Sequence, residues 1–510
     1  MAKASGSDTP DGMSHEQLQR GFKYFVGDGI CSQSMTTLTQ GAILTGFALK
    51  LGASNSVIGV LSAIIALTQL IQIPSIYIVE KYKARRSICV AASAGARTLL
   101  LVMGLIPFLF ASAELAVVFL IVALLINTSI ASISTCSWNS WMHDLIPPDE
   151  LGSLFSKRIA RALAVSIPLY LASGFLIDYS KNLFNSALFG YSILFFGGFG
   201  AGMLGLFFLS HIPHTPLQPA GRKEGFLRKI FDPFKDTNFR KVIVFLAAWN
   251  FAVNMASPFF TVYLLDVLGF EMSTVVILNV LSLLTNIAFL RLWGRVADRL
   301  SNKSVLGICG PLFILVIFLW PFTTMPGVYF LTLPLLVVIY LLIGVSTAGT
   351  TLATQNIGLK LASSGEATSY LASSSFVSSL AAGFSPVLGG VLADGLIGTR
   401  LAWNWTWTTP SGQVSFEVLN FNNWGFVFII AVLIGIYSIH RLAMVQESGE
   451  VKEKVVAKEL VSEMRNGLRN TSFAVGIQRM IEFPYSLMRH QKPSTSSKAS
   501  KGTKESPTET

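Results

Sequence analysis

The chain has 510 residues, of which 52% are hydrophobic and only 13% are charged, with a net charge of +11 and a mean hydropathy of +0.58. Soluble domains carry about a quarter charged residues, so this composition excludes a large soluble protein. Apolar runs of the length that crosses a bilayer as a helix, about 20 residues, recur along the chain. They predict an integral membrane protein of many helices, whereas the short alternating segments of a membrane β-barrel are absent from the sequence.

The first half of the chain carries six of the predicted helices. Residues 1–21 are polar and are expected to form a disordered cytoplasmic tail, with no cleavable signal peptide. Residues 22–212 contain helices predicted over 22–51, 57–79, 87–111, 114–143, 157–178 and 188–212. Residues 213–238 then form a basic, proline-bearing cytoplasmic linker without long apolar runs.

The pattern restarts in residues 239–445. Six further helices are predicted over 239–265, 273–297, 304–324, 329–358, 368–396 and 424–445. Residues 397–423 are expected to form a polar loop, and its tryptophans predict the outer membrane–water interface. The tail, 446–510, begins with a basic amphipathic segment that lies either on the inner leaflet or against the cytoplasmic loops as a soluble helix. Its end is expected to be disordered.

Basic residues are concentrated in alternate links and in the C-terminal tail. This distribution is typical of cytoplasmic loops, so it does not indicate nucleic-acid binding, and it predicts that both termini are cytoplasmic. An even number of spans agrees, and about twelve fit the length. The four cysteines lie in or beside apolar runs and are interpreted as small buried residues, with no metal site. No nucleotide-binding loop or hydrolase motif occurs, so neither a cofactor nor an enzyme activity is expected.

Two charged links follow the second apolar segment of each half and suggest an internal repeat. The stronger one runs from Gly294 to Lys303 with Asp298 and Arg299 at its centre. The weaker one contains Glu80, Lys81, Arg85 and Arg86. The fifth predicted helix ends Gly-Phe-Leu-Ile-Asp at residue 178, and the eleventh ends Gly-Val-Leu-Ala-Asp at residue 394. We therefore interpret the chain as two six-helix repeats.

Two six-helix halves, a basic central linker and the pattern Gly-x-x-x-Asp-Arg-x-x-x-Lys resemble the major facilitator superfamily. Its loop signature is matched by Gly294, Asp298, Arg299 and Lys303, with Ser301 in place of the usual glycine. In the first half Ile76 replaces the leading glycine and one residue is inserted. The resemblance implies an all-α polytopic membrane protein of about twelve helices in two pseudo-repeats, with a binding site at the membrane midplane.

Polar side chains recur at helical spacing in four of the predicted helices. They are Gln33, Thr37 and Gln40 in the first, Thr128, Thr135, Trp138 and Asn139 in the fourth, Asn250 and Asn254 in the seventh, and Thr351 and Gln355 in the tenth. Each set lies on one face of its helix. Hydrogen bonds between helices explain one such face, but the resemblance implies that these four helices line a central cavity. Few charges are expected there, which favours a neutral or zwitterionic organic substrate, because an anion would require arginine or lysine.

Several charged residues lie within the predicted spans. Asp28 in the first helix is the candidate for proton coupling, since a carboxylate in a cavity can carry a proton; the alternative is a structural acid. Arg97 in the third helix is expected to neutralise a buried acid rather than to touch substrate, and it could pair with Asp28. Asp178 and Asp394 at outer helix ends are expected to be solvated.

The charged links also have a mechanical interpretation, which follows from the resemblance. In the family fold each link faces the start of a helix from the opposite half, and helix starts are electropositive. Asp298 would then contact the start of the fifth helix near Lys157 and Arg158, and Glu80 the start of the eleventh. Together with Arg85 and the rest of the Gly294–Lys303 link, these contacts would form a cytoplasmic gate. The alternative is that the bases of the links only set the topology.

These observations predict a secondary active transporter that moves a small organic solute across the cell (inner) membrane by alternating access. The sequence is compatible both with proton-coupled transport through Asp28 and with facilitated diffusion. The expected partners are the solute, membrane lipid and protons. The alternative class is a non-transporting membrane sensor or scaffold of the same fold, which the long tail favours and the four polar faces oppose.

Overall fold

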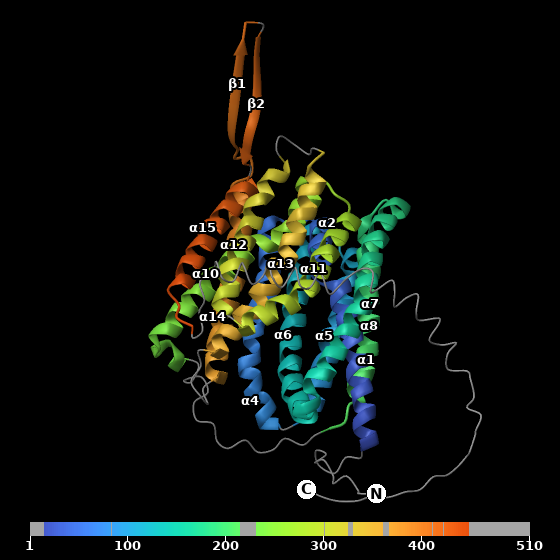
Figure 1. Ribbon diagram of the computed structural model, residues 1–510. Helices are drawn as coiled ribbons and strands as arrows, with labels where there is room; N and C mark the ends of the chain where they lie inside the picture. The colour runs from blue at the N-terminus through green and yellow to red at the C-terminus, as the bar shows by residue number, and fades with distance from the viewer. Residues whose placement is uncertain are drawn as a thin grey trace, which may run out of the picture. The chain divides into compact units, whose positions relative to one another are not determined.

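The computed structural model describes residues 15–82, 84–214, 231–299, 301–324, 330–360, 367–410, 412–421 and 423–447. Over these ranges the protein is a bundle of long helices with one two-stranded hairpin (Figure 1). The ends of the predicted tails, 1–14 and 448–510, and most of the predicted linker, 215–230, lie outside the described residues.

The first half contains nine helical elements in chain order. They are α1 (His15–Thr39), α2 (Ala42–Lys50), α3 (Asn55–Leu67) with a 3-10 turn (Thr68–Ile71), α4 (Gln72–Tyr82), α5 (Arg85–Leu109), α6 (Ala113–Leu145), α7 (Pro148–Phe184) and α8 (Ala187–Ser210).

The second half repeats this order and adds the hairpin. Its elements are a 3-10 turn (Asp232–Lys235), α10 (Thr237–Val262) with a π-helical turn (Tyr263–Val267), α11 (Met272–Arg299), α12 (Asn302–Leu319) with a 3-10 turn (Trp320–Thr324), α13 (Thr332–Lys360), α14 (Ala367–Gly395), β1 (Leu401–Thr409), β2 (Gly412–Phe421) and α15 (Asn423–Ala443).

Eleven helices of the described chain are long and apolar enough to cross a membrane. We assign α1 and α2 together as the twelfth span, which differs from prediction in two ways. It begins at His15, so residues 15–21 are helical rather than a disordered tail. It is also broken at Gly41, whose φ of 60° lies in the left-handed region that glycine adopts without a steric penalty.

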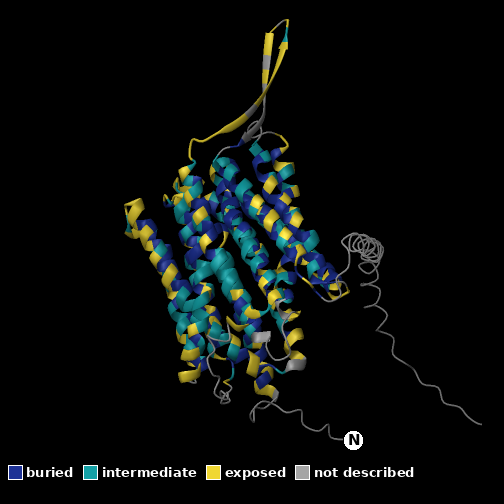
Figure 2. Cartoon of the chain, turned by 90° about the vertical axis from the view of Figure 1, so that its left-hand side faces the viewer, coloured by how far each residue is buried: buried dark blue, intermediate teal, exposed yellow. Residues whose placement is uncertain are grey.

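The outer faces of the helices carry large apolar side chains, as membrane helices require. Figure 2 shows exposed residues along the outside of the bundle. In α6 the exposed apolar side chains recur every three to four residues: Leu115, Val118, Phe119, Val122, Leu125 and Ile126. Such a stripe in contact with water would be unfavourable, whereas in lipid it is matched. Together with the eleven spans it supports the predicted polytopic membrane fold.

The prediction of a polar loop over 397–423 is wrong about the local structure of this segment. Residues 401–421 form an antiparallel hairpin in which Trp405 pairs with Phe416 and Trp407 with Val414. Tryptophan and threonine favour strands, and tryptophan at every second position of β1 is the alternation of a strand. Trp405 and Trp407 are 63% and 69% exposed. The hairpin extends from the end of the bundle opposite to the start of α1 and the end of α15 (Figure 1). We call these the hairpin end and the terminal end.

Candidate functional site

A cavity of about 270 Å³ lies among α1, α5, α6 and α7. Five residues predicted to have functional roles line it: Asp28, Gln40, Thr135, Trp138 and Arg158. Six further polar residues also line it: Ser32, Thr39, Ser93, Arg97, Asn127 and Ser134. Its volume is just below the usual range of small-molecule sites, roughly 300–1,000 Å³, so it can accommodate a small solute.

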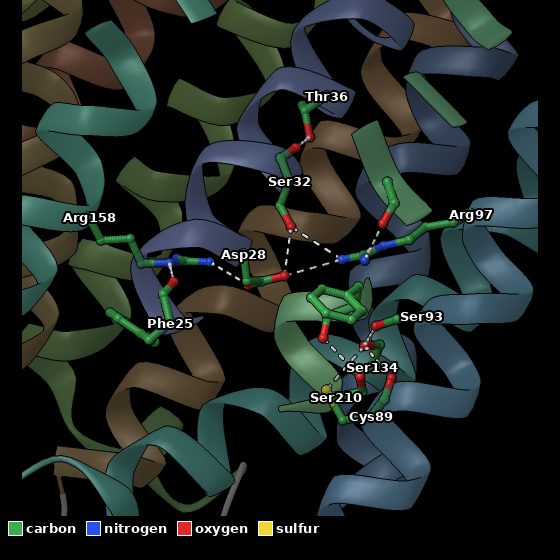
Figure 3. A network of polar contacts seen from close by, with 12 residues as sticks. Phe25, Asp28, Ser32, Thr36, Cys89, Ser93, Arg97, Ser134, Arg158 and Ser210 are labelled. Carbon is green, nitrogen blue, oxygen red and sulfur yellow. Dashed lines mark hydrogen bonds and ion pairs between the residues drawn. The ribbon is translucent and has the colours of Figure 1, made fainter. Parts of the chain in front are cut away.

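Asp28 is the centre of a charged cluster in this cavity (Figure 3). Its Oδ1 lies 3.4 Å from Nη2 of Arg97, and its Oδ2 accepts a hydrogen bond of 3.0 Å from Nη2 of Arg158. Ser32, one turn further along α1, donates to Oδ1 at 3.2 Å. Asp28 is 3% exposed and Arg97 is 7% exposed. Two positive charges and one negative charge give the cluster a net charge of +1.

Arg97 lines the cavity, although the sequence interpretation gave it a supporting place. Its Nη1 donates to the carbonyl oxygen of Gly202 at 2.6 Å. The glycines of α8 allow this approach, because a Cβ on Gly202 would lie 2.9 Å from Sδ of Met35 and 3.2 Å from Cγ of Arg97. The pairing with Asp28 that the sequence left open is present.

Arg158 was expected at the gate, but its side chain turns into the cavity. Besides its pair with Asp28, its Nε donates to the carbonyl oxygen of Phe25 at 3.3 Å. Its guanidinium carbon lies 4.9 Å from the ring centre of Phe25 and 4.8 Å from that of Trp138. Two aromatic rings therefore fix the plane of this guanidinium by cation–π contact.

The other predicted cavity residues lie outside the lining of this cavity. On the first-half helices Gln33 and Thr37 are half-buried, Asn139 is exposed, and Thr128 is buried with its hydroxyl donating to the carbonyl of Leu124 at 2.8 Å. On α10 the Asn254 amide donates to the carbonyl of Asn250, and the Asn250 amide reaches Ser378 on α14 at 3.2 Å. Thr351 and Gln355 of α13 are exposed. Thr128, Asn250 and Asn254 therefore bond to their own helix or to a neighbouring one.

Asp178 and Asp394 were predicted to be solvated at the outer ends of their helices, and this prediction is wrong. Each of them instead forms a contact between the two halves, and the two contacts match. At the hairpin end Asp394 of α14 accepts hydrogen bonds from the backbone amides of Asn55 and Ser56 at 3.3 and 2.8 Å, where α3 begins. Asp178 of α7 accepts them from the amides of Met272 and Ser273 at 3.1 and 2.8 Å, where α11 begins. Each carboxylate thus supplies acceptors for unpaired amides at the electropositive start of a helix.

Two glycines bring these helices together. A Cβ on Gly390 would meet the backbone of Asn55, and one on Gly174 would lie 2.9 Å from Cα of Ser273. Each glycine lies four residues before its aspartate, so the repeated Gly-x-x-x-Asp sequence is the signal that could have identified both contacts.

Comparison with known proteins places this architecture in a family. Residues 29–386 match the description of the Major Facilitator Superfamily. The chain belongs to the major facilitator superfamily. Comparison with curated proteins found no match. Membership and the eleven membrane-length helices make the protein a multi-pass membrane transporter.

Solved structures of other transporters share the fold at low sequence identity. A D-xylose–proton symporter aligns at a TM-score of 0.62 with 14% identity, covering 86% of this chain and 100% of that one. The nucleoside transporter NupG aligns at 0.59 with 14% identity, covering 84% and 98%. A bacterial homologue of the lysosomal transporter Spinster, inward-facing and occupied, aligns at 0.56 with 14% identity, covering 86% and 97%.

At the terminal end of the transporter the first charged link is directed into its own half. Arg85 is 1% exposed, and its Nη1 donates to Oδ2 of Asp144 at 2.6 Å and to the carbonyl of Ser140 at 2.8 Å. Glu80 is exposed and makes no hydrogen bond or ion pair among the described residues. Arg85 therefore attaches α5 to the end of α6 within the first half.

The second link of the transporter is attached to the end of α15. The Lys303 amide donates to Oε2 of Glu447 at 2.7 Å, and its Nζ donates to the carbonyl of Val445 at 2.7 Å. Asp298 and Arg299 are exposed, and Asp298 makes no ion pair in the described ranges. No atom lies within 4 Å of a Cβ built on Gly294. The expected contact between Asp298 and Arg158 is absent from this arrangement, because Arg158 is paired with Asp28.

Proposed function

We propose that this transporter is a secondary active carrier of a small organic solute, that it works by alternating access in the cell (inner) membrane, and that the cavity around Asp28 is its binding site. The observation that carries the proposal is the cluster of Asp28, Arg97 and Arg158 inside a membrane bundle. Buried charges are expensive in a membrane and are typical of substrate or ion pathways.

Alternating access requires contacts between the halves that break on one side at a time. The Asp178 and Asp394 contacts join the halves at the hairpin end, which the sequence predicts to be the outer side. We propose that they hold this end closed and break when the halves rock. The cavity would then open alternately toward the two sides of the membrane.

We also propose a gate at the terminal end, as the sequence predicts. Asp298 and Glu80 are exposed there, and Lys157 remains as an exposed base within α7, roughly two to three turns after the helix start at Pro148. When the terminal end closes, Asp298 would face this part of α7, with Lys157 rather than Arg158 as its partner. Attraction between the carboxylate and the Lys157 ammonium group would hold that end shut.

Proton coupling would act through Asp28. The charged groups that face it are Arg97 from α5 and Arg158 from α7, while Cys31 of α1 and the glycines of α8 complete its surroundings. A proton on Asp28 would cancel the single negative charge of the cluster and raise its net charge from +1 to +2. The two guanidinium groups would then attract the substrate or rearrange, which links proton and solute.

The sequence predicted a neutral or zwitterionic substrate, because few charged residues were expected in the cavity. Three charges line this cavity, so the premise does not hold for it. A zwitterion matches both signs of charge there, and a wholly neutral solute matches neither.

Flux into proteoliposomes tests the function. The purified transporter should take up at least one solute from a panel that includes D-xylose and uridine, chosen from the names of the structural neighbours. An imposed proton gradient should accelerate the uptake, and Asp28→Asn should abolish that acceleration. Uptake that ignores the gradient and is unchanged in Asp28→Asn would reduce the proposal to facilitated diffusion. Binding without uptake would instead favour a sensor.

A further inference from the structure

We infer that the cavity recognises a carboxylate group of its substrate, and that Arg97 and Arg158 are the residues that bind it. This inference rests on the proposed function, because it names the substrate chemistry of the same cavity. It narrows the predicted neutral or zwitterionic solute to one that carries a carboxylate.

The cluster carries one more positive than negative charge. Arg97 and Arg158 share a single acid, and the side chains of Arg97 and Asp28 are 8% and 4% exposed. An uncompensated charge at such a position is unfavourable. A second carboxylate would lower the net positive charge of the cluster by one, whereas a neutral solute would leave this charge in place.

The two guanidinium groups still offer hydrogen-bond donors to a substrate. Arg97 uses Nη1 for Gly202 and Nη2 for Asp28 and Ser32. Arg158 uses Nε for Phe25 and Nη2 for Asp28. Each guanidinium has five N–H donors in a planar fork that matches a carboxylate. Nε of Arg97 and Nη1 of Arg158 have no partner within the described part of the chain, so they are available.

Trp138 lines the cavity beside Arg158. Its indole Nε1 is buried and has no hydrogen-bond partner in the described ranges. Buried donors are nearly always paired, and an exception points to a missing partner. An oxygen of a bound carboxylate next to Arg158 would accept this bond.

The arrangement also explains how a proton would help. Asp28 and the substrate carboxylate require the same two guanidinium groups. A neutral Asp28 would leave both guanidinium groups to the substrate, so carboxylate and proton would bind together. The described second half carries Asn250 and Asn254 on α10 in place of such a cluster, so recognition of the carboxylate belongs to the first half.

Thermal stabilisation of the purified full chain tests the inference with matched acid and amide probes. Acetate and lactate represent simple anions, glycine represents a zwitterion, and acetamide, lactamide and glycinamide are the amide controls. At least one acid should raise the melting temperature while its amide does not. A higher melting temperature with lactate but not with glycine would identify the substrate as a simple anion. A higher melting temperature with glycine but not with lactate would identify it as a zwitterion. Amides as effective as their acids, or no shift with any acid, would overturn the inference.

Variants assign the site to the two arginines. Arg97→Gln and Arg158→Gln should each weaken binding of the effective acid at least about tenfold, because each removes charge-assisted hydrogen bonds. Arg161→Gln is the matched control, since this exposed arginine lies on the same helix outside the cavity. Asp28→Asn should bind the acid more tightly and without dependence on pH. If the arginines were only structural, their variants would be less stable while the preference for acid over amide persisted.

Flux separates this inference from the proposed function. Uptake of D-xylose or uridine without binding of any carboxylate would leave the transporter proposal standing and overturn the carboxylate site. Acid-specific binding that depends on both arginines, without uptake of any probe, would support the site and contradict transport.

Discussion

The two halves of this transporter use the same contact at the hairpin end but differ in the cavity. Asp178 joins α7 to the start of α11, and Asp394 joins α14 to the start of α3, with equal distances of 2.8 Å to the nearer amides. The charged cluster, in contrast, is not repeated on α10. The first half carries Asp28, Arg97 and Arg158 in the cavity, and α10 of the second half carries the amides of Asn250 and Asn254, which lie outside the cavity lining.

This difference separates the contacts that join the two halves from the residues proposed to bind the solute. In the proposed alternating access both halves rock about a common centre, so contacts of equal strength are expected on both halves, and each half supplies one aspartate and one glycine. Recognition of a small charged solute requires only one cluster of charged side chains, so one half alone can provide it. Matched substitutions in the two halves therefore test whether the halves differ in this way.

The largest effect is expected from Asp28→Leu. This change leaves the buried Arg97 and the half-buried Arg158 without an acid and should lower the free energy of unfolding by about 3–5 kcal/mol. Chemical unfolding in detergent measures it. Asn254→Leu is the second-half control, because within the described ranges its amide donates only to its own helix, and it should cost roughly 1 kcal/mol. Equal losses at the two positions would remove the distinction between the halves.

A smaller loss is expected where the halves meet. Gly390→Ala and Gly174→Ala place a Cβ against backbone of the opposite half, and such overpacking costs about 1–3 kcal/mol. Solute flux should fall about tenfold in both variants, because the hairpin end no longer closes. Gly395→Ala near the end of α14 is the control, since nothing lies within 4 Å of its Cβ. A loss confined to one of the two glycines would show that the contacts are not equivalent.

Removing the aspartates should have a moderate and symmetric effect. Asp178→Ala and Asp394→Ala each delete a helix cap worth about 0.5–2 kcal/mol. The populations should shift toward an open hairpin end, and the double variant should show the sum because the sites are separate. Spin labels at Ala53 and Thr399 report the separation of α3 from α14. Unchanged distances in the double variant would exclude these contacts as the closure.

The smallest change in stability is expected for Asp298→Asn. The side chain is exposed, so unfolding should hardly change, whereas transport should slow several-fold if Asp298 closes the terminal end. Glu271→Gln, an exposed acid at the hairpin end, is the control. Transport at the normal rate in Asp298→Asn would argue against the gate.

Much of the fold could be predicted from the sequence alone. Apolar runs determine a membrane helix locally, because each helix satisfies its own backbone in lipid. The Gly294–Lys303 link then identified the superfamily, which the match over residues 29–386 confirms. Even the hairpin was readable, since tryptophan alternates at 403, 405 and 407. The loop prediction failed because it weighed their interfacial preference and not their period of two.

The partners of the charged residues were decided only by tertiary structure. Sequence spacing determines which side chains share a face of one helix, but not which neighbour that face meets. Arg158 reaches Asp28 across 130 residues, and Asp394 reaches Ser56 across 338. The first contact depends on how α7 packs against α1, and the second on how α14 packs against α3. The sequence alone therefore determined a transporter with charges in its membrane helices, and the packing decided that these charges form one cluster in a cavity and two contacts between the halves.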